Sequence, residues 1–183
     1  MNVWEKATPP NIDDFDSVLP LFYDPTGARK DALVELLNVP HSFIVPSGSR
    51  HIEYPPKTTS DDDYLIYVGD NPEAIKEYAS ELVAGGWTDC LYSPDGQPTE
   101  RYAQEQVSGD VWGAFRKGEV NIIIFNDINL YNSSVAATIL CTKLNVKDKE
   151  QRIRIFRWFK FGESIKEGDL NIPTNQLCAP WEE

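Results

Sequence analysis

Short apolar runs, separated by residues that favour turns, recur along the chain and are typical of β-strands. Two of the runs flank a Lys-Gly-Glu turn and therefore predict a hairpin. The runs lie at 42–45 (where Pro46 is expected to end the strand), 63–68, 87–93, 111–116 and 120–125, the last two forming the hairpin. The pattern predicts a mixed, twisted sheet of about four to five strands.

Longer segments space their apolar residues as one face of a helix. The clearest begins at Pro72, which suits a first helical turn, with Asn71 as a capping residue and Gly85 and Gly86 at the end. The other expected helices are 31–37, 129–144 and 148–161.

The last of these helices combines apolar and basic residues. Its spacing predicts that Ile153, Phe156 and Phe159 are buried and that its basic residues point outward.

Strands and helices that mix along one chain predict an α+β fold with α/β character. The 183 residues, of which 41% are hydrophobic, suffice for one domain with a real core. Pro and Asp punctuate residues 1–30, which are expected to form an arm packed on the core. The core is expected over 31–128, and C-terminal helices with a loop-like tail over 129–183.

Charge is distributed unevenly. The formal net charge is -12, which excludes a uniformly basic surface for nucleic acids. Segment 143–160, however, holds seven Lys or Arg against Asp148 and Glu150, so it carries +5 and the rest carries -17. The segment is either a solvated helix face or a surface that attracts a polyanion such as a nucleoside triphosphate, RNA or a tRNA end.

Cysteine and histidine are too sparse for a disulfide framework or a zinc site. Cys90, Cys141 and Cys178 are far apart, and the histidines are His41 and His51. Apolar runs long enough to span a membrane and a secretory signal pattern are both absent from the sequence. These features predict a cytoplasmic protein.

Three consecutive aspartates, Asp61, Asp62 and Asp63, stand where strand 63–68 begins. Like charges on neighbouring residues repel one another, so the three aspartates require either contact with solvent or a neutralising positive charge. Strand alternation places Asp61 and Asp63 on one face, about 7 Å apart, and leaves Asp62 on the other face toward solvent. Paired carboxylates of this kind suit Mg²⁺ better than they suit a core.

The turn Ser47-Gly48-Ser49-Arg50 follows the first predicted strand. Glycine lets a phosphate approach the backbone, and the two serine hydroxyls and backbone N–H groups are anion donors. Arg50 adds a forked donor for phosphate. The turn and the aspartates together predict a site for phosphate and metal.

The motifs, in this order, resemble the nucleotidyltransferase superfamily, which has the polymerase-beta-like fold. The signature of that family is Gly, then Ser or Gly, about a dozen residues, and two acids separated by one residue at the start of a strand. Here eleven residues separate Ser49 from Asp61. The motif is most similar to that of small phage-encoded members, and the resemblance covers roughly 31–162.

The resemblance implies that Gly48 and Ser49 hold the triphosphate of an NTP, with Ser47 and Arg50 nearby. It also implies that Asp61 and Asp63 bind one or two Mg²⁺ ions. The implied reaction transfers a nucleoside monophosphate to an acceptor hydroxyl on RNA, a protein or a small molecule.

The family has a third acid, near the start of the strand after the hairpin, that helps to activate the acceptor. This chain has Asn121 at that place, and Asp127 ends the same strand about 20 Å further on. Asn121 and Asp127 are therefore both candidate catalytic residues.

An amide in the third position leaves a different class of function open. The chain would then keep the nucleotidyltransferase fold without catalysis and act as an acidic binding or inhibitory module on a host protein. If the chain is phage-encoded, either function is expected in the host cytoplasm.

Overall fold

The computed structural model of the chain describes residues 30–31, 33–34, 37, 39, 43–102, 111–163 and 165. The expected arm before Lys30 and the tail beyond Ile165 lie outside the described residues. Within the expected helix 31–37, the described residues 31, 33 and 34 are helical, and Leu33 and Leu37 are buried.

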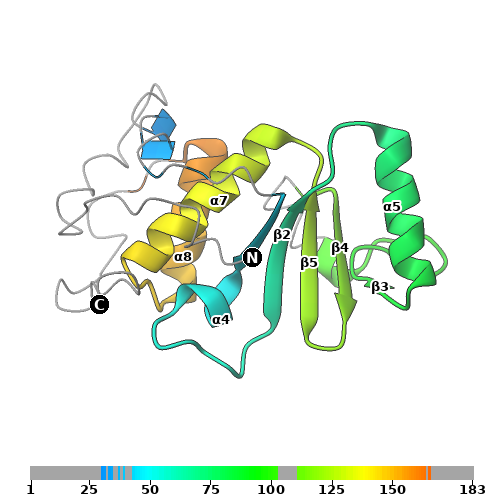
Figure 1. Cartoon of the computed structure of the whole chain (residues 1–183), viewed down its shortest axis with the longest axis horizontal. Coiled ribbons are helices and arrows are strands. Elements are labelled where there is room, and N and C mark those ends of the chain that lie inside the picture. Colours follow the sequence, from blue (N-terminus) through cyan, green and yellow to red (C-terminus); the bar gives the residue numbers. More distant parts are fainter. Residues whose placement is uncertain are drawn as a thin grey trace.

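One mixed sheet organises the fold (Figure 1). Its strand order is β1-β2-β5-β4-β3, in which β2 and β5 are parallel and the other pairs are antiparallel. The strands are β1 (Ile44–Ser47), β2 (Asp62–Tyr67), β3 (Thr88–Asp89), β4 (Gly113–Lys117) and β5 (Val120–Phe125). This arrangement confirms the predicted α+β class, the mixed sheet and the hairpin.

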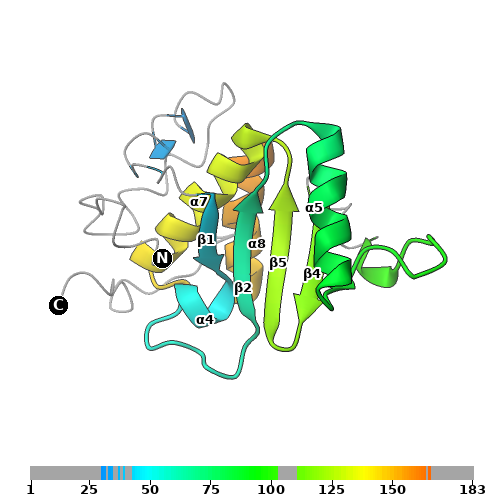
Figure 2. The same cartoon turned by 45° about the vertical axis from the view of Figure 1, so that its right-hand side comes forward.

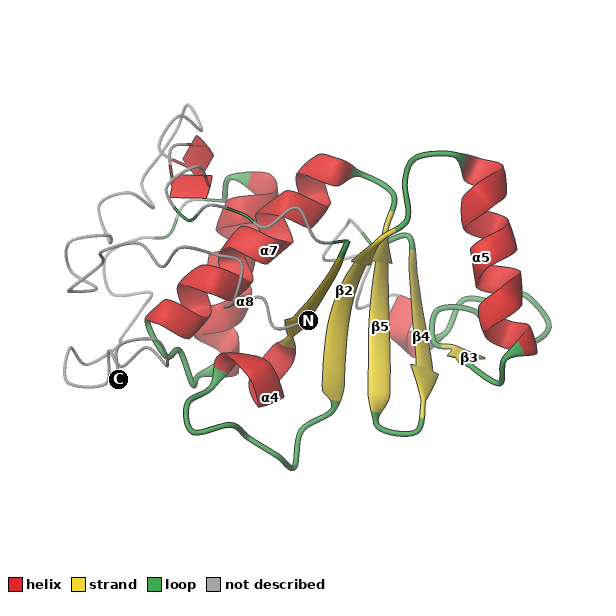
Figure 3. Cartoon of the chain, in the orientation of Figure 1, coloured by secondary structure: helices red, strands yellow, loops and turns green. Residues whose placement is uncertain are grey.

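Helices cover both faces of the sheet. They are α4 (Gly48–Ile52), α5 (Pro72–Ala84), α7 (Ile128–Lys143) and α8 (Lys149–Phe161). Figure 2 shows α7 and α8 behind the sheet and α5 in front of it, and Figure 3 shows the same layers coloured by secondary structure. The three longer helices follow the sequence prediction, and the Asn71 side chain caps α5 by accepting from the Glu73 and Ala74 N–H groups.

Alternate residues of β2 enter different cores. Leu65 belongs to the larger core with α7 and α8, whereas Ile66 belongs to a smaller core that includes Tyr78 and Leu82 of α5. Because neighbouring strand residues point to opposite faces, this assignment also fixes which face each aspartate before them occupies.

Among the strand boundaries that differ from the prediction, two have a clear local cause. The strand β1 continues through Pro46 to Ser47, since β1 is an edge strand where a missing N–H costs no ladder bond. The strand β3 stops at Asp89, because the Asp89 carboxylate accepts from the Leu91 and Tyr92 N–H groups and turns the chain.

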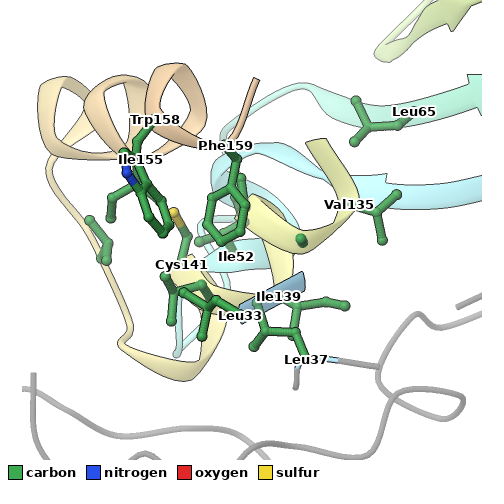
Figure 4. Close-up of a cluster of buried hydrophobic side chains, with 14 of the residues drawn as sticks. Leu33, Leu37, Ile52, Leu65, Val135, Ile139, Cys141, Ile155, Trp158 and Phe159 are labelled. Atoms are coloured by element: carbon green, nitrogen blue, oxygen red, sulfur yellow. The ribbon is translucent and has the colours of Figure 1, made fainter. Parts of the chain in front are cut away.

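The larger core surrounds α7, which is buried along most of its length. Figure 4 shows Ile139 and Cys141 of α7 on the side of the α8 residues Ile155 and Phe159, and Val135 of α7 toward Leu65 of β2. The buried hydroxyls of Ser134, Thr138 and Thr142 each donate to the carbonyl four residues earlier, so polar side chains are accommodated inside this core. In the described part of the chain, none of the helices combines the length and apolar character needed to cross a bilayer.

Helix α8 is rotated relative to the prediction. Ile153 is 47% exposed, whereas Ile155, Trp158 and Phe159 are fully buried. The helix carries apolar residues on two faces, and packing against α7 selects the face with the large Trp158 ring. The rotation also buries Arg152, which the prediction placed outside.

Candidate functional site

The paired acids and Asn121 meet where β2 and β5 begin. The parallel register places Asp63 opposite Asn121, and the Asn121 Nδ2 donates to Asp63 Oδ1 over 3.0 Å. Helix α4 lies beside the same end of β2, at the lower end of the sheet in Figure 1. The structure therefore brings together residues from three separate parts of the sequence.

A cavity of about 590 Å³ opens at this place. Asp61, Asp63 and Asn121 line one part of its wall, and Ser47, Gly48 and Ser49 line another. Basic side chains from three segments also line the cavity: Lys57, Arg101, Lys149, Arg152, Arg157 and Lys160. A cavity with two carboxylates and six cations suits an anionic ligand that carries a metal ion.

Gly48 lies directly against Asp63. Its φ of +74° is a conformation that side chains disfavour, and a Cβ at this position would lie 2.1 Å from Asp63 Oδ2. Glycine is therefore required at position 48 both for its backbone conformation and for the space beside Asp63. This explains how the turn approaches the carboxylate so closely.

The two serines of the turn have different hydrogen bonds. Thr138 donates its own proton to the Ser134 carbonyl, so in the 3.0 Å contact between hydroxyls it accepts from Ser47. The Ser47 proton is thus engaged in the core. Ser49 Oγ, by contrast, accepts from Arg152 Nη2 at 2.6 Å, which leaves the Ser49 proton to donate to a ligand.

Arg50 does not line the cavity. Its Nη2 donates to the Thr58 carbonyl at 2.9 Å and lies 3.4 Å from Glu119, so it ties the loop before β2 to the β4–β5 turn. The structure therefore does not bring Arg50 to the cavity, where the sequence analysis expected it to contact phosphate. Arg152 of α8 occupies the place next to Ser49 instead.

Asp61 and Asp63 share the cavity, as strand alternation predicts, but their environments differ. Asp61 is half exposed and pairs with Arg116 at 2.5 Å. Burial raises the pKa of Asp63 above its ordinary value, the Asn121 hydrogen bond lowers it, and the Asp61 charge raises it further. Asp63 is thus a carboxylate that the fold holds at a cost in solvation.

Asp62 is not turned to solvent as predicted. Its Oδ1 lies 2.6 Å from His51 Nε2, and its Oδ2 accepts from the Tyr64 hydroxyl at 3.2 Å. The run of three aspartates is therefore tolerated because each member has a separate partner: Arg116, His51 and Asn121.

Asp127 lies at the opposite end of β5 and caps α7. Its carboxylate accepts from the Asn129 and Leu130 N–H groups, so the structure does not bring Asp127 together with Asp61 and Asp63. Over the described ranges, no group of three His, Cys, Asp or Glu side chains converges on a point where one ion would touch all of them.

The oxygens at the cavity nevertheless fit a hard divalent cation. Two carboxylates are available, and the buried Asn121 Oδ1 has no hydrogen-bond partner among the described residues. Two carboxylates are a donor set that Mg²⁺ accepts, with water and phosphate oxygens as further ligands. Asn121 turns its Nδ2 to Asp63, so its buried Oδ1 faces away from that carboxylate. Asp61 and Asp63 would hold the ion.

Sequence reasoning missed two cationic contributors, Lys57 and Arg101, and placed Arg152 of the basic segment 143–160 on the outward face of its helix. Lys57 comes from a loop and Arg101 from a helical stretch at 100–102, and neither stretch carries a motif. Arg152 did have a signal, because it precedes the buried Ile155 and Phe159 by three and seven residues and so shares their helix face.

Replacing Asp63 by asparagine is expected to raise the melting temperature by a few degrees at pH 7 without metal. Because the pKa of Asp63 is higher in the folded than in the unfolded state, its contribution to stability falls as the pH rises from about 3.8 through the folded-state value. Urea unfolding at pH 4 and pH 7 measures the difference, which is expected to be larger at pH 7.

The matched control is Asp70→Asn, an exposed position beyond the other end of β2. An equal gain in Asp70→Asn, or a gain in Asp63→Asn that does not depend on pH, would contradict the assignment of Asp63 as a desolvated carboxylate.

Comparison with known proteins adds no relative: the chain matches no protein-family model, no curated protein and no solved structure.

Proposed function

We propose that the chain is a nucleotidyltransferase-like protein that binds a nucleoside triphosphate with Mg²⁺ in this cavity. The observation that supports this proposal is the convergence of the Gly48-Ser49 turn, the Asp61–Asp63 pair and Asn121 on one cavity. These are the positions that the resemblance to the nucleotidyltransferase superfamily assigns to phosphate, metal and the third ligand.

Different residues of the cavity contact different parts of the ligand. Ser49 donates its hydroxyl proton to a phosphate oxygen, while Arg152 fixes the direction of that hydroxyl from behind. Lys57 and Arg101 line the cavity and offset phosphate charge. Bound Mg²⁺ neutralises phosphate charge and makes the α-phosphorus more electrophilic.

The proposed reaction transfers a nucleoside monophosphate. An acceptor oxygen forms a bond to the α-phosphorus, the bond from that phosphorus to the bridging oxygen breaks, and pyrophosphate leaves with the bonding electrons. The acceptor proton goes to a carboxylate or to water, because the Asn121 amide cannot accept it.

Asn121 also favours a second candidate function. Two carboxylates and an amide retain metal and nucleotide binding but lack the third acid, and Asp61 already has Arg116 as a counter-ion. The second candidate is therefore a catalytically inactive protein of the same fold that acts as an acidic binding module on another protein.

Thermal unfolding with each NTP tests the shared binding step. At a ligand concentration about 100 times Kd, we expect a magnesium-dependent rise in melting temperature of about 5–10 °C. The rise is expected to vanish in the double variant Asp61→Asn/Asp63→Asn and to persist in Asp70→Asn. No rise with any NTP in the wild-type protein would refute nucleotide binding.

Turnover separates the two candidates. With an NTP labelled at the α-phosphate, transfer predicts a labelled acceptor and free pyrophosphate. Nucleotide binding without pyrophosphate release, together with biological activity that is unchanged in Asp61→Asn/Asp63→Asn, would support the binding module.

A further inference from the structure

Helix α8 presents a continuous stripe to the cavity, on the side away from its buried face. The stripe residues recur at intervals of three and four, as one helix face requires. Besides Arg152, which contacts Ser49, they are Lys149, Ile153, Phe156, Arg157, Lys160 and Phe161, and we call these six residues the α8 stripe.

Cations and aromatic rings alternate along the α8 stripe. The Arg157 guanidinium lies 5.6 Å from the centre of the Phe161 ring, and the Lys160 ammonium lies 5.8 Å from that of Phe156. Phe161 is 39% exposed, and so retains surface that a flat apolar group can cover. The Arg157 guanidinium also donates to both carboxylate oxygens of Glu163, so the pair that offers both a ring for stacking and a charge for a phosphate is Lys160 with Phe156.

The α8 stripe extends well past the triphosphate contacts. Arg152, which reaches Ser49, is in the first turn of α8, and Phe161 is nine residues further on. At 1.5 Å per residue, about 13 Å of helix lies beyond the phosphate end of the cavity. A bound triphosphate thus leaves most of the α8 stripe to a second ligand.

Charge selects the class of that ligand. The α8 stripe holds the cations Lys149, Arg157 and Lys160, of which Arg157 pairs with Glu163, on a chain with a formal net charge of -12, so the α8 stripe attracts anions that the acidic remainder of the surface repels. An acidic peptide would satisfy the cations but would not use the rings. The bases of a duplex would not be available for stacking on the rings, and its high density of negative charge would be repelled by the acidic remainder of the protein surface.

We propose that the α8 stripe binds a single-stranded polynucleotide, which is the acceptor of the transfer reaction. The acceptor role rests on the proposed function, whereas strand binding by the α8 stripe stands without it. Phosphates contact Lys149 and Lys160, and bases stack on Phe156 and Phe161.

The test is fluorescence anisotropy with a labelled 12-nucleotide single strand of adenylate, in EDTA and without NTP. Charge reversal in Lys149→Glu or Lys160→Glu is expected to weaken binding and to lower the slope of log K against log salt by about 0.7 each. Phe161→Ala is expected to weaken binding at least about fivefold. The matched control is Lys76→Glu on the exposed side of α5, which is expected to bind as the wild type does.

Several outcomes would overturn the proposal: no strand binding, equal weakening in Lys76→Glu, equal affinity for the duplex, or equal competition by a poly-glutamate peptide. Magnesium-dependent NTP stabilisation that persists without strand binding would leave the proposed function intact and refute this inference. Strand binding that depends on Lys149 and Lys160, but without any NTP stabilisation, would refute the proposed function and support the α8 stripe as a polynucleotide-binding surface.

Discussion

Gly48→Ala is expected to destabilise the protein by about 3 kcal/mol and to abolish magnesium-dependent stabilisation by NTP. The positive φ of residue 48 disfavours any side chain. The new Cβ would also lie 2.1 Å from Asp63 Oδ2 and 3.0 Å from Asp63 Cβ. Because Asp63 Cβ is fixed to β2, rotating the carboxylate alone cannot relieve the contact, and the turn must move away from the strand.

A second glycine separates backbone strain from collision. Gly69 has a φ of +90°, but a Cβ added there would meet nothing within 4 Å, so Gly69→Ala should cost only about 1–2 kcal/mol and leave nucleotide binding intact. Urea unfolding followed by tryptophan fluorescence measures both variants, since Trp158 is fully buried.

A double-mutant cycle completes this test. Adding Asp63→Ala removes the carboxylate from the collision, so Gly48→Ala should cost less in that background than in the wild type. Equal costs for Gly48→Ala and Gly69→Ala, with no coupling to Asp63, would show that contact between the turn and the carboxylate is unimportant.

Arg152→Met is expected to destabilise the protein by about 3–5 kcal/mol. Arg152 is 8% exposed, and its guanidinium donates to the Val146 and Lys147 carbonyls, both at 3.0 Å, and to Ser49 Oγ. It also lies 3.6 Å from Glu53 in a pair that is mostly buried. Methionine fills the space but leaves the acceptors without donors and Glu53 without its counter-ion.

Two further variants identify the cause of the loss. Adding Glu53→Gln to Arg152→Met removes the uncompensated charge and should recover part of the stability. Arg154→Ala, on the exposed side of the same helix, should change the free energy of unfolding by about 0.5 kcal/mol or less. The role of Arg152 as a buried link would be contradicted if Arg152→Met and Arg154→Ala were equally stable.

Local signals predicted most of the fold, because they are settled within a few residues. The Asn71 cap with Pro72 defines the start of α5, and the residues on either side of the Lys117–Gly118–Glu119 turn define the hairpin. Local signals did not predict which face of α8 is buried. Ile153 and Ile155 are both apolar, and only contact with α7 decides which of them is buried.

The sequence predicted the parts of the candidate site that depend on the alternation of side chains along a strand. It did not predict the parts that depend on contacts between distant residues. Asp61 and Asp63 share the cavity because strand geometry places them on one side. Arg50 lies outside the cavity because its side chain is held by partners elsewhere in the sequence, and Asp127 lies outside it because it caps α7. Arg152 reaches the cavity because of the way in which α8 packs on the rest of the fold. Neither kind of information is present in a single motif.

The parallel pairing of β2 with β5 also bears on the order in which the chain folds. The hairpin of β4 and β5 closes over a short turn, whereas Asp63 and Asn121 are 58 residues apart and meet only after a long segment of chain has been restrained. Contacts between such distant residues lose the most chain entropy before they gain any stability, so they tend to form late. During synthesis, a nascent chain from which β5 has not yet emerged carries Asp61 and Asp63 with no Asn121 beside them, and the cavity comes into being only when the sheet is complete.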